Sequence, residues 1–187
     1  MKKHIKWNSP MVLSFVFASA LALGLNYVTN GLTNGLLFSV YRGSLSDPLF
    51  YVRLFLHVLG HANAQHYINN MMMILLVGPL LEEKYGAKNL LSIIVAVALV
   101  TGIAHIFIQG DTMLLGASGV VFAFILLASI TGERKGGQIP ITFILVALFY
   151  IGQQVYEGLF LQDNVSQITH ILGGFLGALY GLVINRK

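Results

Sequence analysis

The segment LLSIIVAVALVTGIAHIFI, residues 90–108, decides the class of this chain, because it contains no Asp, Glu, Lys or Arg. A helix that crosses the hydrocarbon core of a bilayer needs about 20 mostly apolar residues. The whole chain has the same character: 56% of its 187 residues are hydrophobic and 10% are charged. A soluble domain carries about 25% charged residues, so an ordinary cytosolic globule, a disordered chain and a collagen-like fibre are excluded. We therefore expect an all-α integral membrane protein.

Five other apolar segments accompany this one. The pattern predicts a bundle of six transmembrane helices at about residues 11–27, 67–81, 90–108, 118–131, 139–156 and 168–184. These spans leave no room for a soluble domain, so residues 1–187 are expected to form one membrane domain. Lys2, Lys3 and Lys6 precede the first span, as in a signal peptide, but no convincing small-residue cleavage site follows it. We expect this segment to be retained as a helix.

The basic residues indicate how the bundle is oriented. With six spans both termini lie on one side, and nine of the eleven basic residues fall on that side: Lys2, Lys3, Lys6, Lys84, Lys88, Arg134, Lys135, Arg186 and Lys187. The opposite side holds only Arg42 and Arg53. Basic loops remain in the cytoplasm, so we expect cytoplasmic termini in a multi-pass protein. The long connection from Asn30 to Leu56 then lies outside, and it is apolar enough to rest in the interface.

Several kinds of site are excluded by composition. The chain has no cysteine, so it has no disulfide framework, no thiolate nucleophile and no Cys-ligated metal. The net charge of +4 is small and dispersed, which argues against nucleic-acid binding. His57 and His61 have the i, i+4 spacing of metal ligands, but no HExxH sequence or acidic partner accompanies them. We expect no metal and no cofactor.

The polar residues at membrane depth gather in the outer half of the predicted bundle, and they are His57, His61, His66, Asn70, His105, Ser118 and His170. Polar groups inside a bilayer are costly and therefore informative. Each has a plain structural explanation when taken alone. A membrane serine commonly bonds the preceding turn, an interfacial histidine commonly bonds a neighbouring helix, and Asn70 could tie two helices together.

Together these residues suggest a nucleophile and its base. Ser118 stands among small residues that let a substrate backbone approach its hydroxyl. His170 begins a stripe of glycines at 173, 177 and 181, a spacing that permits close contact between helices. A histidine on such a seam can reach a serine on the facing helix, as a Ser–His nucleophile requires. His66 and Asn70 share a helix face and could supply hydrogen bonds to an oxyanion.

Three short sequences in this arrangement resemble the motifs of the rhomboid intramembrane serine proteases. GASG at residues 116–119 matches the GxSG of that family, and HILGGFLG at residues 170–177 matches its HxxGxxxG. HANAQHYINN at residues 61–70 matches its HxxxxHxxxN. The resemblance covers essentially the whole chain, and the motifs fall in order on the second, fourth and sixth predicted spans.

The resemblance implies a role for each matched residue. Ser118 would be the nucleophile and His170 the general base, in a dyad without a carboxylate. His66, Asn70 and the backbone N–H of Ser118 would stabilise the oxyanion. Residues with a structural role at the rim of the site would be His61, Gly116, Gly119 and Phe122. Glu82 would be a structural carboxylate at the cytoplasmic end of the second span.

The chain departs from the family pattern at two positions. Phe122 stands where some members have a tyrosine that packs against the catalytic histidine, so the stacking surface is kept and a hydroxyl is lost. In the family a tryptophan usually precedes the arginine that Arg53 matches, and here that position is Val52. This change affects the anchoring of the first loop and not the chemistry.

The function implied is hydrolysis of peptide bonds in or near the single transmembrane helices of other membrane proteins. The expected location is a plasma membrane, of a bacterium given the small size. A non-hydrolytic binding or quality-control protein with the same fold is the alternative, and a small transporter with a histidine relay is a third reading. The intact Ser118 and His170 favour the enzyme. A transporter would need polar residues from face to face, whereas these stop in the outer half.

Overall fold

A computed structural model describes residues 7–130, 141–142, 144–149, 152 and 167–184 of this chain. The described part is helical and contains no β-strand, apart from one isolated bridge between Val40 and Leu114. Its elements are α1 (Pro10–Val28), the π-helix η1 (Asn34–Phe38), α2 (Pro48–Leu56), the 3₁₀ helix η2 (His57–Leu59), α3 (Ala64–Tyr85), α4 (Ala87–Gln109), α5 (Ser118–Ile130) and α7 (Gln167–Ile184). The expectation of an all-α fold is confirmed.

Long helices occupy five of the six predicted segments, and their ends lie within four residues of the expected ones. The predicted span at 139–156 lies mostly outside the described residues, although 141–142, 144–149 and 152 are helical. By length and composition, α1 and α4 could each cross a membrane, whereas α5 and α7 are shorter apolar helices. The count of six spans remains a prediction.

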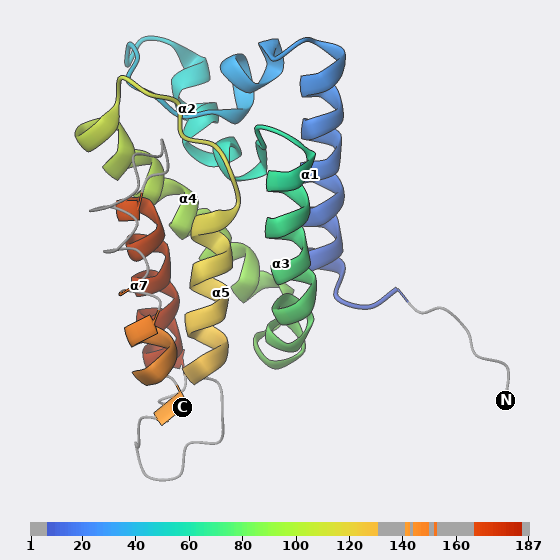
Figure 1. Ribbon diagram of the computed structural model, residues 1–187, viewed down its shortest axis with the longest axis vertical. Coiled ribbons are helices and arrows are strands. Elements are labelled where there is room, and N and C mark those ends of the chain that lie inside the picture. The colour runs from blue at the N-terminus through green and yellow to red at the C-terminus, as the bar shows by residue number, and fades with distance from the viewer. Residues whose placement is uncertain (1–6, 131–140, 143, 150–151, 153–166, 185–187) are drawn as a thin grey trace, which may run out of the picture.

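The helices form a bundle in which α3, α5 and α7 begin at the end where α1 and α4 finish (Figure 1). The centre of the bundle is α5, which packs against α3, α4 and α7. Its buried side chains include Val120, Ala123, Phe124 and Leu127. Helices α3, α5 and α7, which carry His66, Asn70, Ser118 and His170, thus all begin at the same end of the molecule.

The contact between α5 and α7 is made by backbone as much as by side chains. A Cβ atom added at Gly173 would collide with the carbonyl oxygen of Gly119, and one added at Gly177 would collide with that of Ala123. Farther along, a Cβ at Gly181 would meet side-chain atoms and no backbone, with Leu127 at 3.0 Å and Ile130 at 3.4 Å. Small residues allow such an approach, which gains van der Waals contact where the hydrophobic effect cannot drive helix association. The glycine stripe therefore fixes how closely α7 lies against α5.

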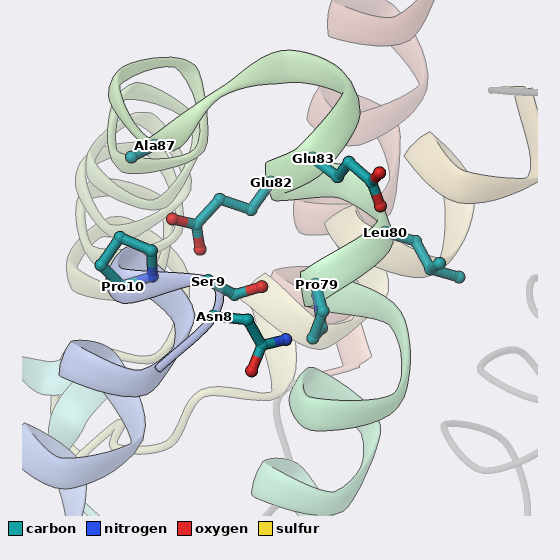
Figure 2. Close-up of a pocket in the computed structure, with 8 residues that line it drawn as sticks. All are labelled: Asn8, Ser9, Pro10, Pro79, Leu80, Glu82, Glu83 and Ala87. Carbon is teal, nitrogen blue, oxygen red and sulfur yellow. The ribbon is translucent and has the colours of Figure 1, made fainter. Parts of the chain in front are cut away.

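Helix α1 is joined to α3 by Glu82. Ser9 precedes α1 with a left-handed backbone (φ 52°) and gives no side-chain cap. The N–H groups of Met11 and Val12 donate instead to Oε1 and Oε2 of Glu82, both at 3.0 Å. In Figure 2 the Glu82 carboxylate points toward the start of α1, while Glu83 points away from it. The buried carboxylate satisfies N–H groups that have no partner within their own helix and favours the positive end of the helix dipole.

Ser9, Glu82 and Glu83 border a pocket of about 620 Å³ at the end of the bundle where α1 begins (Figure 2). Ser118 begins α5 at the opposite end (Figure 1). The pocket is therefore remote from the predicted site.

The connection between α1 and α3 contains a helix that the sequence analysis did not predict. Asp47 caps α2 by accepting the N–H of Leu49 at 2.9 Å, and Pro48 occupies the first helical position. Arg53 is only 3% exposed, donates to Asp47 at 2.8 Å and lies 4.6 Å from the centre of the Tyr41 ring. This connection is thus an ordered part of the bundle.

Candidate active site

The loop before α5 adopts a conformation that only glycine tolerates at its centre. Gly116 has φ +131°, and a Cβ there would lie 2.7 Å from Cε1 of His66 and 2.8 Å from Nε2. Its N–H donates to the carbonyl oxygen of His57 at 2.9 Å. The missing side chain lets the His66 ring lie directly against the loop, two residues before Ser118. The loop, the first turn of α3 and the connection before it therefore meet at one point.

Ser118 and His170 are in contact. Ser118 Oγ lies 2.8 Å from His170 Nε2, within hydrogen-bonding distance, and His170 is 8% exposed. A neutral imidazole carries its proton on one nitrogen. With that proton on Nδ1, the Ser118 hydroxyl donates to Nε2, which is the arrangement in which a base can take the hydroxyl proton.

Phe122 packs on His170, with ring centroids 4.9 Å apart and planes inclined by 48°. It lies one turn after Ser118 on α5, so one helix carries both the hydroxyl and the ring against which the imidazole rests. The phenyl ring thus occupies the position at which the sequence analysis expected a stacking surface.

Asn70 lies in the second turn of α3, on the same face as His66. Its side chain is 7% exposed, and its Nδ2 has no hydrogen-bond acceptor among the described residues. A buried donor without an acceptor costs about 1–3 kcal/mol. Helix α3 is itself fixed at this end, because Asn63 caps it by accepting the N–H of His66 at 2.9 Å. The N-terminal part of α3 therefore offers an unused donor one turn after His66, whose ring lies against Gly116.

The other histidines bond to backbone carbonyl oxygens. His61 is fully buried, and its Nδ1 lies 3.1 Å from the oxygen of Leu59. Its ring packs edge-on against His66, with centroids 5.0 Å apart. The Nε2 of His57 lies 3.0 Å from the oxygen of Ala98, and that of His105 lies 2.9 Å from the oxygen of Thr112. His61 therefore supports His66, whereas His57 and His105 fix the connections before α3 and α5.

A metal centre has no support in the described part of the chain, where no group of three His, Asp or Glu side chains could hold an ion. The described acids are also placed away from His170. Asp47 pairs with Arg53, Asp111 pairs with Arg42 at 3.1 Å, and Glu82 bonds to α1. Glu83 is exposed at the end of the bundle where α1 begins. Glu133, Glu157 and Asp163 lie outside the described residues.

Sequence reasoning missed two contacts that hold this arrangement. The carbonyl of His57 receives the Gly116 N–H, and the side-chain amide of Asn34 donates to the carbonyl of His61 at 3.0 Å. Both contacts are accepted by backbone carbonyl oxygens, which every residue type possesses, so the sequence does not mark where the acceptors lie.

Comparisons with known proteins point to one family. A family model described as Rhomboid domain matches residues 49–187. The chain is 27% identical over 163 residues to Rhomboid-related protein 2 of Mus musculus, covering 76% of this chain and 53% of that protein. It is 29% identical over 130 residues to Rhomboid protease GlpG of Pectobacterium atrosepticum, covering 68% and 46%. The Haemophilus influenzae protein of the same name is 25% identical over 132 residues, covering 70% and 68%.

The chain spans about half of the length of the first two of these relatives. The matched region begins within α2 and contains α3, α5 and α7, and α1 lies outside it.

Proposed function

Because the chain belongs to the rhomboid family, we propose that it is an integral membrane serine endopeptidase that uses Ser118 and His170. The observation that carries the proposal is the 2.8 Å contact between Ser118 Oγ and His170 Nε2. Two residues 52 positions apart are brought to this distance by α5 and α7, and the family match covers both. The relatives named as proteases support the reaction class.

The proposed reaction begins with attack of Ser118 Oγ on the carbonyl carbon of a peptide bond, while His170 Nε2 takes the hydroxyl proton. The carbonyl oxygen becomes an oxyanion, and His170 then delivers the proton to the leaving nitrogen. Water hydrolyses the acyl-enzyme with His170 again acting as base. This two-step route needs no metal and no cofactor.

Asn70, His66 and the N–H of Ser118 are the proposed donors to the oxyanion. The Nδ2 group of Asn70 is buried and has no acceptor in the described structure, as expected of a donor that awaits charge formed during the reaction. Donors that are positioned in advance stabilise such charge without reorganising. His66 lies against the loop at Gly116, two residues before Ser118. This contact supports its proposed role as a second donor.

Packing would help to orient His170. The Phe122 ring supports its face, and the close approach of Gly173 to Gly119 fixes the first turns of α7 against α5. A dyad without a carboxylate, as the resemblance to the family implies, would leave the serine modestly activated.

The proposed substrates are single-span membrane proteins, which would enter the bundle sideways from the bilayer. A helix does not offer its hydrogen-bonded carbonyl groups to Ser118, so the substrate must unwind locally. We further propose six spans within one domain over residues 1–187, cytoplasmic termini and a multi-pass location in a plasma membrane. The bias of basic residues supports this orientation.

Labelling with a serine-reactive fluorophosphonate tests the dyad directly. The wild-type protein should be labelled at Ser118, and Ser118→Ala and His170→Ala should each remove the labelling. Ser129→Ala is the matched control, because Ser129 lies on the same helix with its hydroxyl bonded to the carbonyl of Leu126. Equal labelling of wild type and Ser118→Ala would refute the assignment. A folded wild type that is neither labelled nor able to cleave model substrates would instead favour a non-hydrolytic binding role.

A further inference from the structure

A second cavity lies away from the dyad, on the seam between α2 and the C-terminal half of α4. It has a volume of about 480 Å³ and is lined mainly by apolar side chains, among them Leu45, Phe50, Leu54, Ile103 and Phe107. Phe50 and Leu54 form its buried floor, whereas Leu45 and Phe107 are more than two-thirds exposed. The cavity is therefore an open groove and not a hole inside the core.

One cation stands at the rim of this groove and is held in place. The backbone N–H of Arg42 donates to the carbonyl of Gly110 at 2.8 Å, and Nη2 donates to the carbonyl of Ile106 at 3.2 Å. A Cβ at Gly110 would lie 2.9 Å from Cβ of Arg42, so the arginine packs directly on the end of α4. The guanidinium is thereby fixed above the groove instead of moving freely.

The charge of this arginine is only weakly satisfied. Its Nη1 lies 3.1 Å from Asp111, but the two side chains are 55% and 88% exposed. An ion pair so exposed contributes little and is easily exchanged. A guanidinium has five N–H groups, and the bonds to Asp111 and to the carbonyl of Ile106 use two of them. Arg42 can therefore still bind a second anion.

The membrane setting, which rests on the proposed function, limits what can fill the groove. Water does not occupy an apolar groove that opens toward hydrocarbon, so a lipid chain is the available filler. Arg42 lies at the end of the bundle where α4 finishes, so it would stand near the headgroups. Guanidinium groups bind phosphate oxygens with two parallel hydrogen bonds.

We propose that this groove is a binding site for one phospholipid, with an acyl chain along Phe50, Leu54 and Ile103 and the phosphate at Arg42. The apolar walls of the groove suit the acyl chain, and the fixed cation Arg42 at their outer end suits the phosphate. The bound lipid would join α2 to α4.

A photoactivatable phosphatidylglycerol with a diazirine in its acyl chain provides the test. The purified protein, in vesicles of unlabelled phosphatidylcholine that contain this probe, should be crosslinked at Leu45, Ile103 and Phe107 more than at other exposed apolar residues. Arg42→Gln should lower this crosslinking about fivefold, the effect of one basic residue near a membrane surface. Lys88→Gln, which removes an exposed positive charge at the other end of α4, should leave it unchanged.

Two further arms separate phosphate recognition from simple filling of the groove. A diacylglycerol probe with the same diazirine lacks the phosphate and should label the groove weakly, with no response to Arg42→Gln. Ile103→Trp should block labelling by filling the groove, whereas Val95→Trp, at another exposed position of α4, should not. Inorganic phosphate that competed as well as unlabelled phospholipid would show an anion site and contradict the proposal.

Equal labelling of all exposed apolar residues would overturn the proposed site. Labelling that does not change in Arg42→Gln would also overturn it. The assay needs no hydrolysis, so it can be repeated on Ser118→Ala with the same expected result. Release of the protein from membranes by alkaline carbonate would refute the membrane premise separately. Failure of the lipid site and failure of the proposed protease are thus distinguishable.

Discussion

At the scale of single residues, the side chains of the candidate site differ in the kind of hydrogen-bonding group that they leave unused. His57, His61 and His105 each bond a backbone carbonyl through one ring nitrogen, and the other ring nitrogen of each is buried without a partner among the described residues. In a neutral imidazole that unused nitrogen is an acceptor, whereas Asn70 holds a buried N–H donor with no acceptor among the described residues. Because an oxyanion needs donors, Asn70 is the one of these four residues expected to act during the reaction.

Asn70→Ala should therefore lower the turnover number more than it changes the Michaelis constant. The loss of one oxyanion donor costs on the order of 10²–10³ in turnover, and the donors that remain would reduce this. The matched control is Asn69→Ala, whose exposed side chain accepts a bond from Gln65. Kinetics on a single-span substrate in detergent micelles measure both constants. An unchanged turnover number with a raised Michaelis constant would assign Asn70 to substrate binding instead.

Glu82→Gln should lower the free energy of unfolding by about 1–3 kcal/mol, because an amide nitrogen cannot accept one of the two buried N–H groups of α1. Denaturant unfolding in micelles measures the change. Glu83→Gln alters the adjacent, exposed carboxylate and should have little effect. Equal effects of the two substitutions would show that charge at this end matters, and not the bonds to α1.

The pair of Asp47 and Arg53 predicts an acid-dependent stability. The hydrogen bond from Arg53, together with the N–H of Leu49, lowers the pKa of Asp47 from its ordinary value of 3.8. A lowered pKa in the folded state stabilises the fold above about pH 4, and this contribution is lost as the pH falls through the lower value. The melting temperature, followed by circular dichroism, should therefore fall between pH 5 and pH 3.

The Asp47→Asn variant is the control for that prediction. It should melt at a lower temperature than the wild type at neutral pH, since the buried Arg53 loses its partner. Its melting temperature should also change less between pH 5 and pH 3. Parallel pH profiles for the two proteins would exclude Asp47 as the source of the acid dependence.

At the scale of elements, the seam between α5 and α7 determines whether Ser118 and His170 can meet. The backbones approach so closely that Gly173 and Gly177 have no space for a methyl group. The positions of the two reacting side chains thus depend on glycines that lie one and two turns away from His170.

Gly177→Ala should separate α7 from α5 and abolish most of the cleavage activity, because its Cβ would collide with the backbone oxygen of Ala123. Gly181→Ala is the comparison, since its Cβ would meet only side-chain atoms of Leu127 and Ile130, and the closest of these, Cδ1 of Leu127, can move. Its activity should remain within about threefold of the wild type, consistent with a cost below about 1 kcal/mol. Specific activity and melting temperature should be measured for both. Comparable losses in the two variants would contradict a backbone contact at Gly177.

The positions of the long helices could be predicted from sequence because continuous apolar segments mark them. Helix α2 was missed because its nine residues are too few for a clear helical pattern, although Asp47-Pro48 is a recognisable start. The contact between Ser118 and His170 could be predicted from GASG and HILGGFLG. The bond from Gly116 to the carbonyl of His57 could not, since it joins backbone atoms through the folding of distant segments.

At the scale of the whole molecule, the dyad lies at one end of the bundle. Ser118 is the first residue of α5 and His170 is in the first turn of α7, and both helices begin at the end opposite to the start of α1 (Figure 1). With cytoplasmic termini, this end faces outward. The reaction would then take place in the outer leaflet, a few residues below the interface at 1.5 Å per residue.

Cleavage should therefore occur near the outer end of a substrate helix, preferably beside residues that weaken helices, such as glycine. Mass spectrometry of the new termini of a single-span substrate locates the cut. The same substrate with its glycine moved to the cytoplasmic half provides the control and should be cut more slowly. Cuts in the cytoplasmic half would refute either the orientation or the dyad.

The bond between Glu82 and the start of α1 also has a consequence for the order of events during synthesis. Met11 leaves the ribosome 71 residues before its acceptor, which at about 5–20 residues per second is an interval of roughly 4–14 s. During that time the first turn of α1 must satisfy its N–H groups with water. The nascent helix must therefore keep this end at the headgroups until α3 arrives, and Glu82 then replaces the water.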